Sequence, residues 1–123
     1  MSRIFNIKEL YHKNDSDNTE AKNTTSAADS LAIPVTHGYV AKTTGADAEA
    51  LTLADGIPGQ ILVIHLVTDG GGTGTLTPAT STGWSTIAFA DAGDQAVLLF
   101  VDSIIGWIIL STFGLTAQPT VAA

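Results

Sequence analysis

The chain has 123 residues, enough for one domain and an appendage. Only 14% of the residues are charged, the formal net charge is −7, and there is no cysteine. This composition excludes disulfides and thiolate metal sites, and the shortage of Lys and Arg argues against a nucleic-acid partner. The most apolar window, residues 97–110, is too short to cross a bilayer and contains Asp102, so no membrane partner is expected.

Composition separates residues 1–33 from the rest of the chain and predicts an extended or partly disordered N-terminal arm. Residues 12–30 contain almost no large apolar side chain and cannot bury enough surface to offset chain entropy. The amphipathic piece before them is either a single helix or docking peptide at the end of a tether, or an ordinary frayed terminus. The apolar side chains of this piece are Ile4, Phe5, Ile7, Leu10 and Tyr11.

Residues 34–123 predict an all-β body with a short C-terminal tail. Turns rich in Asp and Gly recur at intervals of roughly ten residues, as in sandwiches and barrels. The expected fold is an antiparallel β-sandwich or a small β-barrel, of jelly-roll or tulip type. Strands are predicted at residues 35–43, 49–54, 60–68, 74–77, 85–89, 95–102 and 106–111.

Two segments, residues 51–66 and 87–101, repeat one pattern of strand, Ala-Asp turn, Gln and apolar strand. Each predicts a β-hairpin. The second strands of these units, 60–68 and 95–102, are apolar on both faces, whereas an isolated antiparallel sandwich leaves one face wet. Burial of the second face against neighbouring subunits is therefore favoured over a closed barrel.

The contact between subunits is expected to use apolar and aromatic residues of the later strands. His65, within an apolar strand, is either a neutral core residue or a residue that meets its copies on a symmetry axis and binds an ion or water there. Trp107 is interpreted as a packing residue. The predicted contact between subunits consists of His65, Phe100, Trp107, Ile109 and Phe113.

The chain lacks the residue patterns that catalysis and cofactor binding require. The glycine run 69–75 precedes a predicted strand and has no following Lys-Ser/Thr, so it indicates a loop rather than a phosphate site. No G-x-S-x-G occurs. We expect no enzymatic activity, no metal and no cofactor. Several acids are interpreted as turn residues rather than calcium ligands, namely Asp55, Asp69, Asp91, Asp94 and Asp102.

The pattern of residues 51–110 resembles a module of tailed-bacteriophage virion proteins, in particular small head decoration (cement) proteins. The likeness rests on the ADG-x-x-GQ turn, the DGG-TxTP segment, the F-x-DAGD turn and the final G-W strand. It implies a β-sandwich or barrel that forms a homotrimer without a cofactor. The trimer would be made in the host cytoplasm, bind the major capsid protein on the outer surface of the virion and stabilise contacts between capsid subunits. In such proteins a terminal arm commonly clamps neighbouring capsid subunits. That role suits residues 1–33, with the apolar side chains of the amphipathic piece, Ile4, Phe5, Ile7, Leu10 and Tyr11, as the capsid contacts.

A receptor- or glycan-binding module of a phage tail fibre or spike is the alternative. In that case Trp84 would stack on a sugar ring, and the loop at residues 69–83 would complete the contact.

Overall fold

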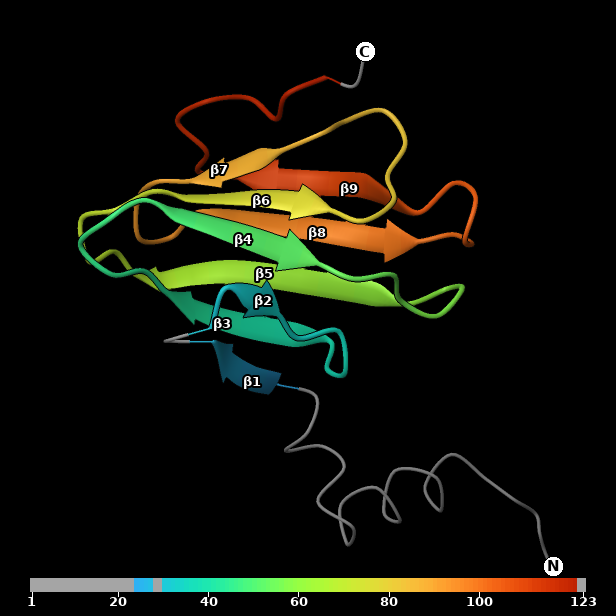
Figure 1. Cartoon of the computed structure of the whole chain (residues 1–123), viewed down its shortest axis with the longest axis horizontal. Coiled ribbons are helices and arrows are strands. Elements are labelled where there is room, and N and C mark those ends of the chain that lie inside the picture. The colour runs from blue at the N-terminus through green and yellow to red at the C-terminus, as the bar shows by residue number, and fades with distance from the viewer. Residues whose placement is uncertain (1–23, 28–29, 122–123) are drawn as a thin grey trace, which may run out of the picture.

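The computed structural model describes residues 24–27 and 30–121, which form two β-sheets packed face to face (Figure 1). The predicted β-sandwich is confirmed, and the strands of the described residues do not close into a barrel. The five-stranded sheet contains, in spatial order, β1 (Thr24–Ala27), β3 (Tyr39–Thr43), β5 (Ile61–Thr68), β8 (Gln95–Phe100) and β9 (Trp107–Phe113). The four-stranded sheet contains β2 (Ala32–Ile33), β4 (Glu49–Leu53), β6 (Gly74–Pro78) and β7 (Ile87–Phe89).

The strand directions differ from the expected antiparallel arrangement, because both sheets are mixed. β1, β3 and β5 run parallel to one another, and so do β2, β4 and β6. The antiparallel pairs are β5–β8, β8–β9 and β6–β7. The cause is the chain path: from β3 to β6 each strand lies in the opposite sheet to the one before, so the chain returns to each sheet in the same direction (Figure 1).

The hairpin prediction is wrong for both repeated segments. Each segment instead joins a strand of the four-stranded sheet to a strand of the five-stranded sheet, β4 to β5 in the first and β7 to β8 in the second. The two turns are closed by different side chains. The Gln60 Oε1 accepts a hydrogen bond from the Ile57 N–H (2.9 Å), whereas Asp94 Oδ2 accepts from Ala90 (2.9 Å) and Asp91 (3.0 Å). The repeat therefore encodes a connection between sheets.

One of the predicted turns does form a hairpin, between β8 and β9. Asp102 Oδ1 accepts hydrogen bonds from the N–H groups of Ile104 (2.9 Å) and Ile105 (2.7 Å). Gly106 closes the turn with a φ of 74° and a hydrogen bond to the Asp102 carbonyl (2.7 Å). A Cβ at Gly106 would also overlap the backbone of Thr80, so two constraints require glycine at this position.

The core lies between the sheets and is built from alternate residues of the strands. In β5 the inward residues are Leu62, Ile64 and Leu66, all fully buried, and in β8 every second residue is buried. Burial of one such aliphatic side chain contributes about 1.5–3 kcal/mol. The complete set of buried apolar residues is Ala27, Ile33, Val40, Leu51, Leu53, Leu62, Ile64, Leu66, Leu76, Trp84, Ile87, Phe89, Ala96, Leu98, Phe100 and Trp107.

The sandwich begins within the region expected to be an arm. β1 and β2 lie in the range 1–33, yet β1 pairs with β3 and β2 pairs with β4. At the other end of the chain, Thr120 exchanges backbone hydrogen bonds with Ser85 (2.7 Å) and Thr86 (2.9 Å), so the tail covers the edge beside β7. In the part of the chain described, no helix has the length and apolar character needed to span a membrane.

Candidate interaction surface

The outward faces of the two sheets have opposite characters. The four-stranded sheet presents small or hydroxyl-bearing residues to solvent, including Ala50, Thr52, Thr75 and Thr77. The five-stranded sheet presents large apolar residues instead. We give the name apolar face to the following outward residues of β3, β5, β8 and β9, together with Val101 directly after β8: Tyr39, Ala41, Ile61, Val63, His65, Val67, Gln95, Val97, Leu99, Val101, Ile108, Ser111 and Phe113.

Strand register arranges the apolar face in rows across β5, β8 and β9. The first row is Ile61–Leu99–Ile108, which is wholly aliphatic. The second row is Val63–Val97–Ser111, and the third is His65–Gln95–Phe113. Side chains directly opposite each other on neighbouring strands have Cβ atoms about 4.5–5.5 Å apart. The first two rows therefore form a continuous aliphatic surface, and polar groups enter towards the third row.

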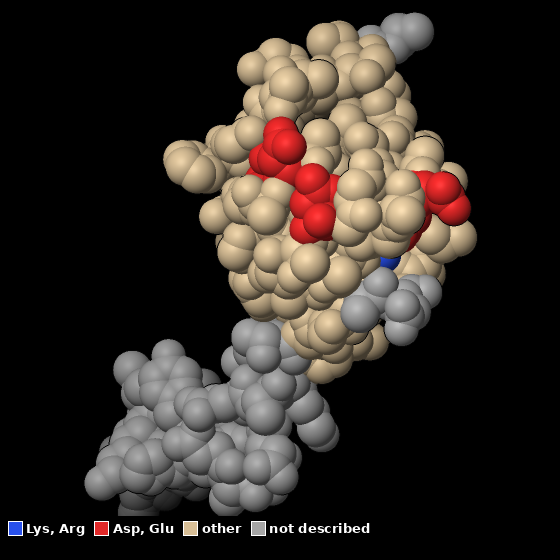
Figure 2. Space-filling view, turned by 90° about the vertical axis from the view of Figure 1, so that its left-hand side faces the viewer, with Lys and Arg blue, Asp and Glu red and all other residues tan. Residues whose placement is uncertain are grey.

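The apolar face carries no Asp, Glu, Lys or Arg, although the described residues include one lysine and seven acids. The acids lie in loops or at strand ends, and Figure 2 shows several of them at the end of the sandwich where β4 begins and β5 ends. Three loops meet there, with Asp47, Asp69 and Asp91 among their residues. The molecule therefore has an acidic end and one uncharged, apolar side.

A second group of exposed apolar side chains lies at the opposite end of the sandwich. Ile104 is 85% exposed in the β8–β9 turn, and Ile57 is 73% exposed in the β4–β5 turn. The two turns are joined, because the Gly59 N–H donates to the Phe100 carbonyl (2.8 Å). The hydrogen-bonded turns therefore keep both isoleucine side chains exposed to solvent. They lie next to the strand ends that contribute the row Ile61–Leu99–Ile108 (Figure 1).

His65 is half-buried on the apolar face and is not a core residue. Its Nδ1 lies 2.7 Å from the hydroxyl of Tyr39 on β3, and the two rings meet edge to face with centroids 5.9 Å apart. This contact fixes the orientation of the imidazole. The interpretation of His65 as a core residue is therefore wrong, and its contact with its copies on a symmetry axis stays a prediction.

The five residues predicted for the trimer interface divide between the two sides of the sheet. His65 and Phe113 lie on the apolar face, and Phe113 is 69% exposed. Phe100 and Trp107 are buried in the core, where their rings pack edge to face at 5.2 Å, and Ile109 also packs against the core. The assignment of Phe100 and Trp107 to a contact between subunits is therefore wrong, whereas that of the partly buried Ile109 stays a prediction. Alternation separates the two sides of a strand, but does not indicate which of two apolar sides faces inward.

Trp84 cannot supply the sugar contact assigned to it. Its side chain is 2% exposed, and its Nε1 donates a hydrogen bond to the Trp107 carbonyl (3.0 Å). A tryptophan that stacks on a sugar must present a ring face to solvent. Trp84 is a core residue that ties the β6–β7 connection to β9. The predicted arm residues Ile4, Phe5, Ile7, Leu10 and Tyr11 lie outside the described residues.

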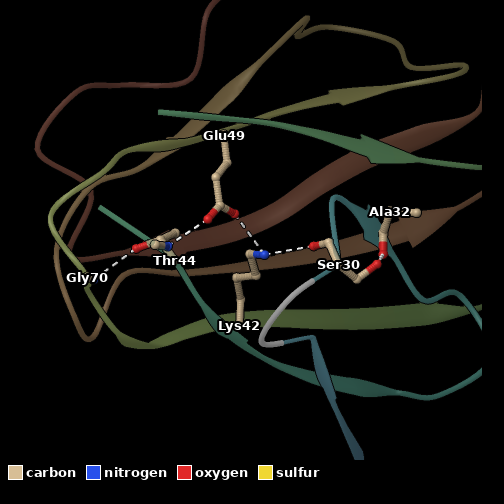
Figure 3. Close-up of polar contacts among 7 residues, drawn as sticks. Ser30, Ala32, Lys42, Thr44, Glu49 and Gly70 are labelled. Carbon is tan, nitrogen blue, oxygen red and sulfur yellow. Dashed lines mark hydrogen bonds and ion pairs between the residues drawn. The ribbon is translucent and has the colours of Figure 1, made fainter. Parts of the chain in front are cut away.

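A buried ion pair connects the two sheets near the acidic end (Figure 3). Lys42 of β3 is 1% exposed, and its Nζ lies 2.9 Å from Glu49 Oε1 at the start of β4. The ammonium also donates to the Ser30 carbonyl (2.7 Å), while Glu49 Oε2 accepts from the Gly45 N–H (2.6 Å). The hydrogen bond from Gly45 and the Lys42 ammonium together lower the pKa of Glu49 below its ordinary value of 4.5, although burial opposes them.

The lowered pKa of Glu49 predicts acid sensitivity. Because the carboxylate is favoured in the folded protein, its contribution to stability is complete above pH 4.5 and is lost as the pH falls through the lower, folded-state pKa. Urea unfolding at pH 7 and at pH 3 should show a smaller loss of stability for Glu49→Gln than for the natural chain. Equal losses in the two proteins would contradict this assignment.

The turn interpretation is confirmed for three of the acids, Asp69, Asp94 and Asp102. Asp69 Oδ1 accepts from the Gly71 N–H (2.8 Å), in addition to the contacts of Asp94 and Asp102 given above. Asp91 accepts from the Thr116 hydroxyl (2.8 Å). Within residues 24–27 and 30–121, no three His, Cys, Asp or Glu side chains gather into a group able to hold a metal ion.

Comparison with known proteins returned no match, either to a family model or to a curated protein sequence. The uncharged apolar face of the five-stranded sheet is therefore the feature from which a function can be argued.

Proposed function

We propose that this chain is a structural protein of a tailed-phage virion, a decoration (cement) protein that binds the capsid surface as a homotrimer. The observation that carries the proposal is the apolar face, a sheet surface with large aliphatic residues and no charge. Contiguous apolar surfaces of this kind mark contact sites. The β-sandwich also agrees with the fold that the resemblance to decoration proteins implies.

In this role the body forms the trimer, and residues 1–23, which we name the tether, bind the capsid. The tether enters the body at β1, which lies at the edge of the five-stranded sheet beside β3. Three tethers on one trimer would engage a capsid together, and multivalency would raise the overall affinity without new kinds of contact. The trimer would stabilise the shell by linking neighbouring capsid subunits.

The test combines native mass with capsid binding. The full chain is expected to form trimers and to co-sediment with capsids assembled from the major capsid protein of the same phage. Deletion of residues 1–23 should leave folded trimers that no longer co-sediment. The deletion must end before Thr24, because β1 supplies backbone hydrogen bonds to β3. Failure of the full chain to bind capsids would overturn the function, and undiminished binding after the deletion would overturn the role of the tether.

The structure does not strengthen the glycan-binding alternative, because Trp84, the residue on which it depended, is buried. We therefore do not propose it.

A further inference from the structure

We infer that β1 and β2 open from the sandwich together, as one strap, while the rest of the sandwich stays folded. The strap consists of β1, β2 and the residues Ser30 and Leu31 directly before β2. It supplies an edge strand to each sheet, because β1 pairs with β3 and β2 pairs with β4 (Figure 1). The inference concerns a movement within the free chain, so it goes beyond the proposed function.

The strap is held to the body by few contacts. β1 pairs along four residues and β2 along two, and both ladders are parallel, a pairing that is slightly less stable per residue than the antiparallel one. Among its described side chains, only Ala27 and Ile33 are buried. By contrast, β5 and β8 each bury three apolar residues in the core. Segments with little buried apolar surface open at a lower free energy than the core does.

A buried charge lies under the strap. Lys42 Nζ donates to the Ser30 carbonyl (2.7 Å) and lies 2.9 Å from Glu49 Oε1 (Figure 3). Lys42 and Glu49 both belong to the body, so their ion pair can persist when the strap opens. Opening breaks the hydrogen bond to Ser30, but it also lets water reach an ammonium that is 1% exposed in the closed form. Because the burial of a charge is costly, this hydration offsets part of the cost of opening.

The opening has a defined limit directly after β2. Val35 packs against the core, and its carbonyl accepts a hydrogen bond from Gln60 Nε2 (2.6 Å). Gln60 lies directly before β5, so this bond ties the chain to the body independently of the strap. β3 and β4 also keep their other neighbours, β5 and β6. Release of the strap would therefore leave β3 and β4 as sheet edges and would add residues 24–33 to the tether.

The test is hydrogen exchange of the full chain at neutral pH, followed for individual amides by NMR. Leu98→Ala, in the core part of β8, weakens the body equally whether the strap is closed or open. It should speed the exchange of the β5 and β8 amides by about thirtyfold or more and leave the β1 and β2 amides unchanged. Equal acceleration of strap and body amides would overturn the inference, because the strap would then open only by global unfolding.

A milder core variant keeps the test decisive if Leu98→Ala does not fold. Ile87 is fully buried in β7, which lies at the edge of its sheet opposite to β2. Ile87→Val removes a single methylene group and should speed exchange of the β8 amides by about fivefold, again without a change in the strap. Acceleration of the strap amides by the same factor would count against separate opening.

Two further variants test whether β1 and β2 open as one unit. Ile33 is 3% exposed, whereas Leu31, two residues earlier, is 51% exposed. Ile33→Ala should speed exchange of the β1 amides by about thirtyfold or more, although β1 lies in the other sheet. Leu31→Ala, the matched control, should change it by less than about threefold. If the β1 amides exchange at the natural rate in Ile33→Ala, the two strands open separately and the inference is wrong.

These measurements are independent of the proposed function. Exchange is followed in the free chain, and capsids play no part in it. A chain that never binds capsids can therefore still show the separate opening of the strap. Conversely, a chain that binds capsids through the tether can lack this opening, in which case the inference fails and the proposed function stands.

Discussion

Trp107→Ala is expected to lower the free energy of unfolding by about 3–5 kcal/mol, the usual cost of removing a buried large aromatic side chain. The Trp107 ring is completely buried and packs against Phe100. Its Nε1 donates to the Ala54 carbonyl (2.9 Å) at the start of the connection from β4 to β5. The substitution therefore opens a cavity between the sheets and leaves a carbonyl of the connection without its donor. Urea unfolding followed by circular dichroism measures the change.

Two variants give this prediction its controls. Trp107→Phe keeps most of the ring volume and removes the hydrogen bond to Ala54, so its loss should be clearly smaller. Ile108→Ala alters the next residue of β9, which pairs with Leu99 on the apolar face, and should cost less in a monomer than Trp107→Ala. A loss for Ile108→Ala as large as that for Trp107→Ala would contradict the assignment of Trp107 to the core and Ile108 to the surface.

Lys42→Ala is expected to lower the free energy of unfolding by about 3 kcal/mol, the lower end of the range for breaking a buried ion pair, because Glu49 keeps some contact with water. The substitution leaves Glu49 without its cation and the Ser30 carbonyl without its donor. It also removes the lysine stem from between the sheets. Urea unfolding at neutral pH tests the prediction.

A double variant distinguishes loss of charge from loss of packing. Lys42→Met keeps most of the stem, so any remaining loss reports the unpaired Glu49 together with the lost hydrogen bond to the Ser30 carbonyl. Adding Glu49→Gln should recover part of that loss, since a buried pair replaced on both sides is often close to neutral. If Glu49→Gln recovers nothing, the contribution of Lys42 is packing and the hydrogen bond to Ser30, not the ion pair.

The strands of the body could be predicted because they combine alternating residues with clear turns. Each predicted strand from 35–43 to 106–111 overlaps a strand from β3 to β9, and the apolar run at 60–68 coincides closely with β5. β1 and β2 could not be found in this way. β1 contains the polar sequence TTSA and joins the sheet through backbone hydrogen bonds to β3, which leave no hydrophobic pattern.

The apolar face could be predicted only in part, because the local sequence does not show which side of an apolar strand packs inward. The sequence shows that β5 and β8 are apolar on both sides, and the structure buries one side and leaves the other partly exposed. The residues Leu98 and Leu99 are identical in type, yet one lies in the core and the other on the apolar face. Nothing local distinguishes them, because the choice depends on where the second sheet packs.

The amino-acid sequence by itself determined that the body is all-β and that two of its strands, 60–68 and 95–102, are apolar on both sides. It could do so because composition, alternation and turn residues are local properties. It also determined that the pattern at 51–66 recurs at 87–101. Only the tertiary structure decided that these repeats connect two sheets rather than form hairpins, and that Trp84, Phe100 and Trp107 belong to the core. The physical reason is that strand pairing and burial depend on contacts between residues far apart in the chain, such as Leu99 with Ile61 and Trp107 with Ala54.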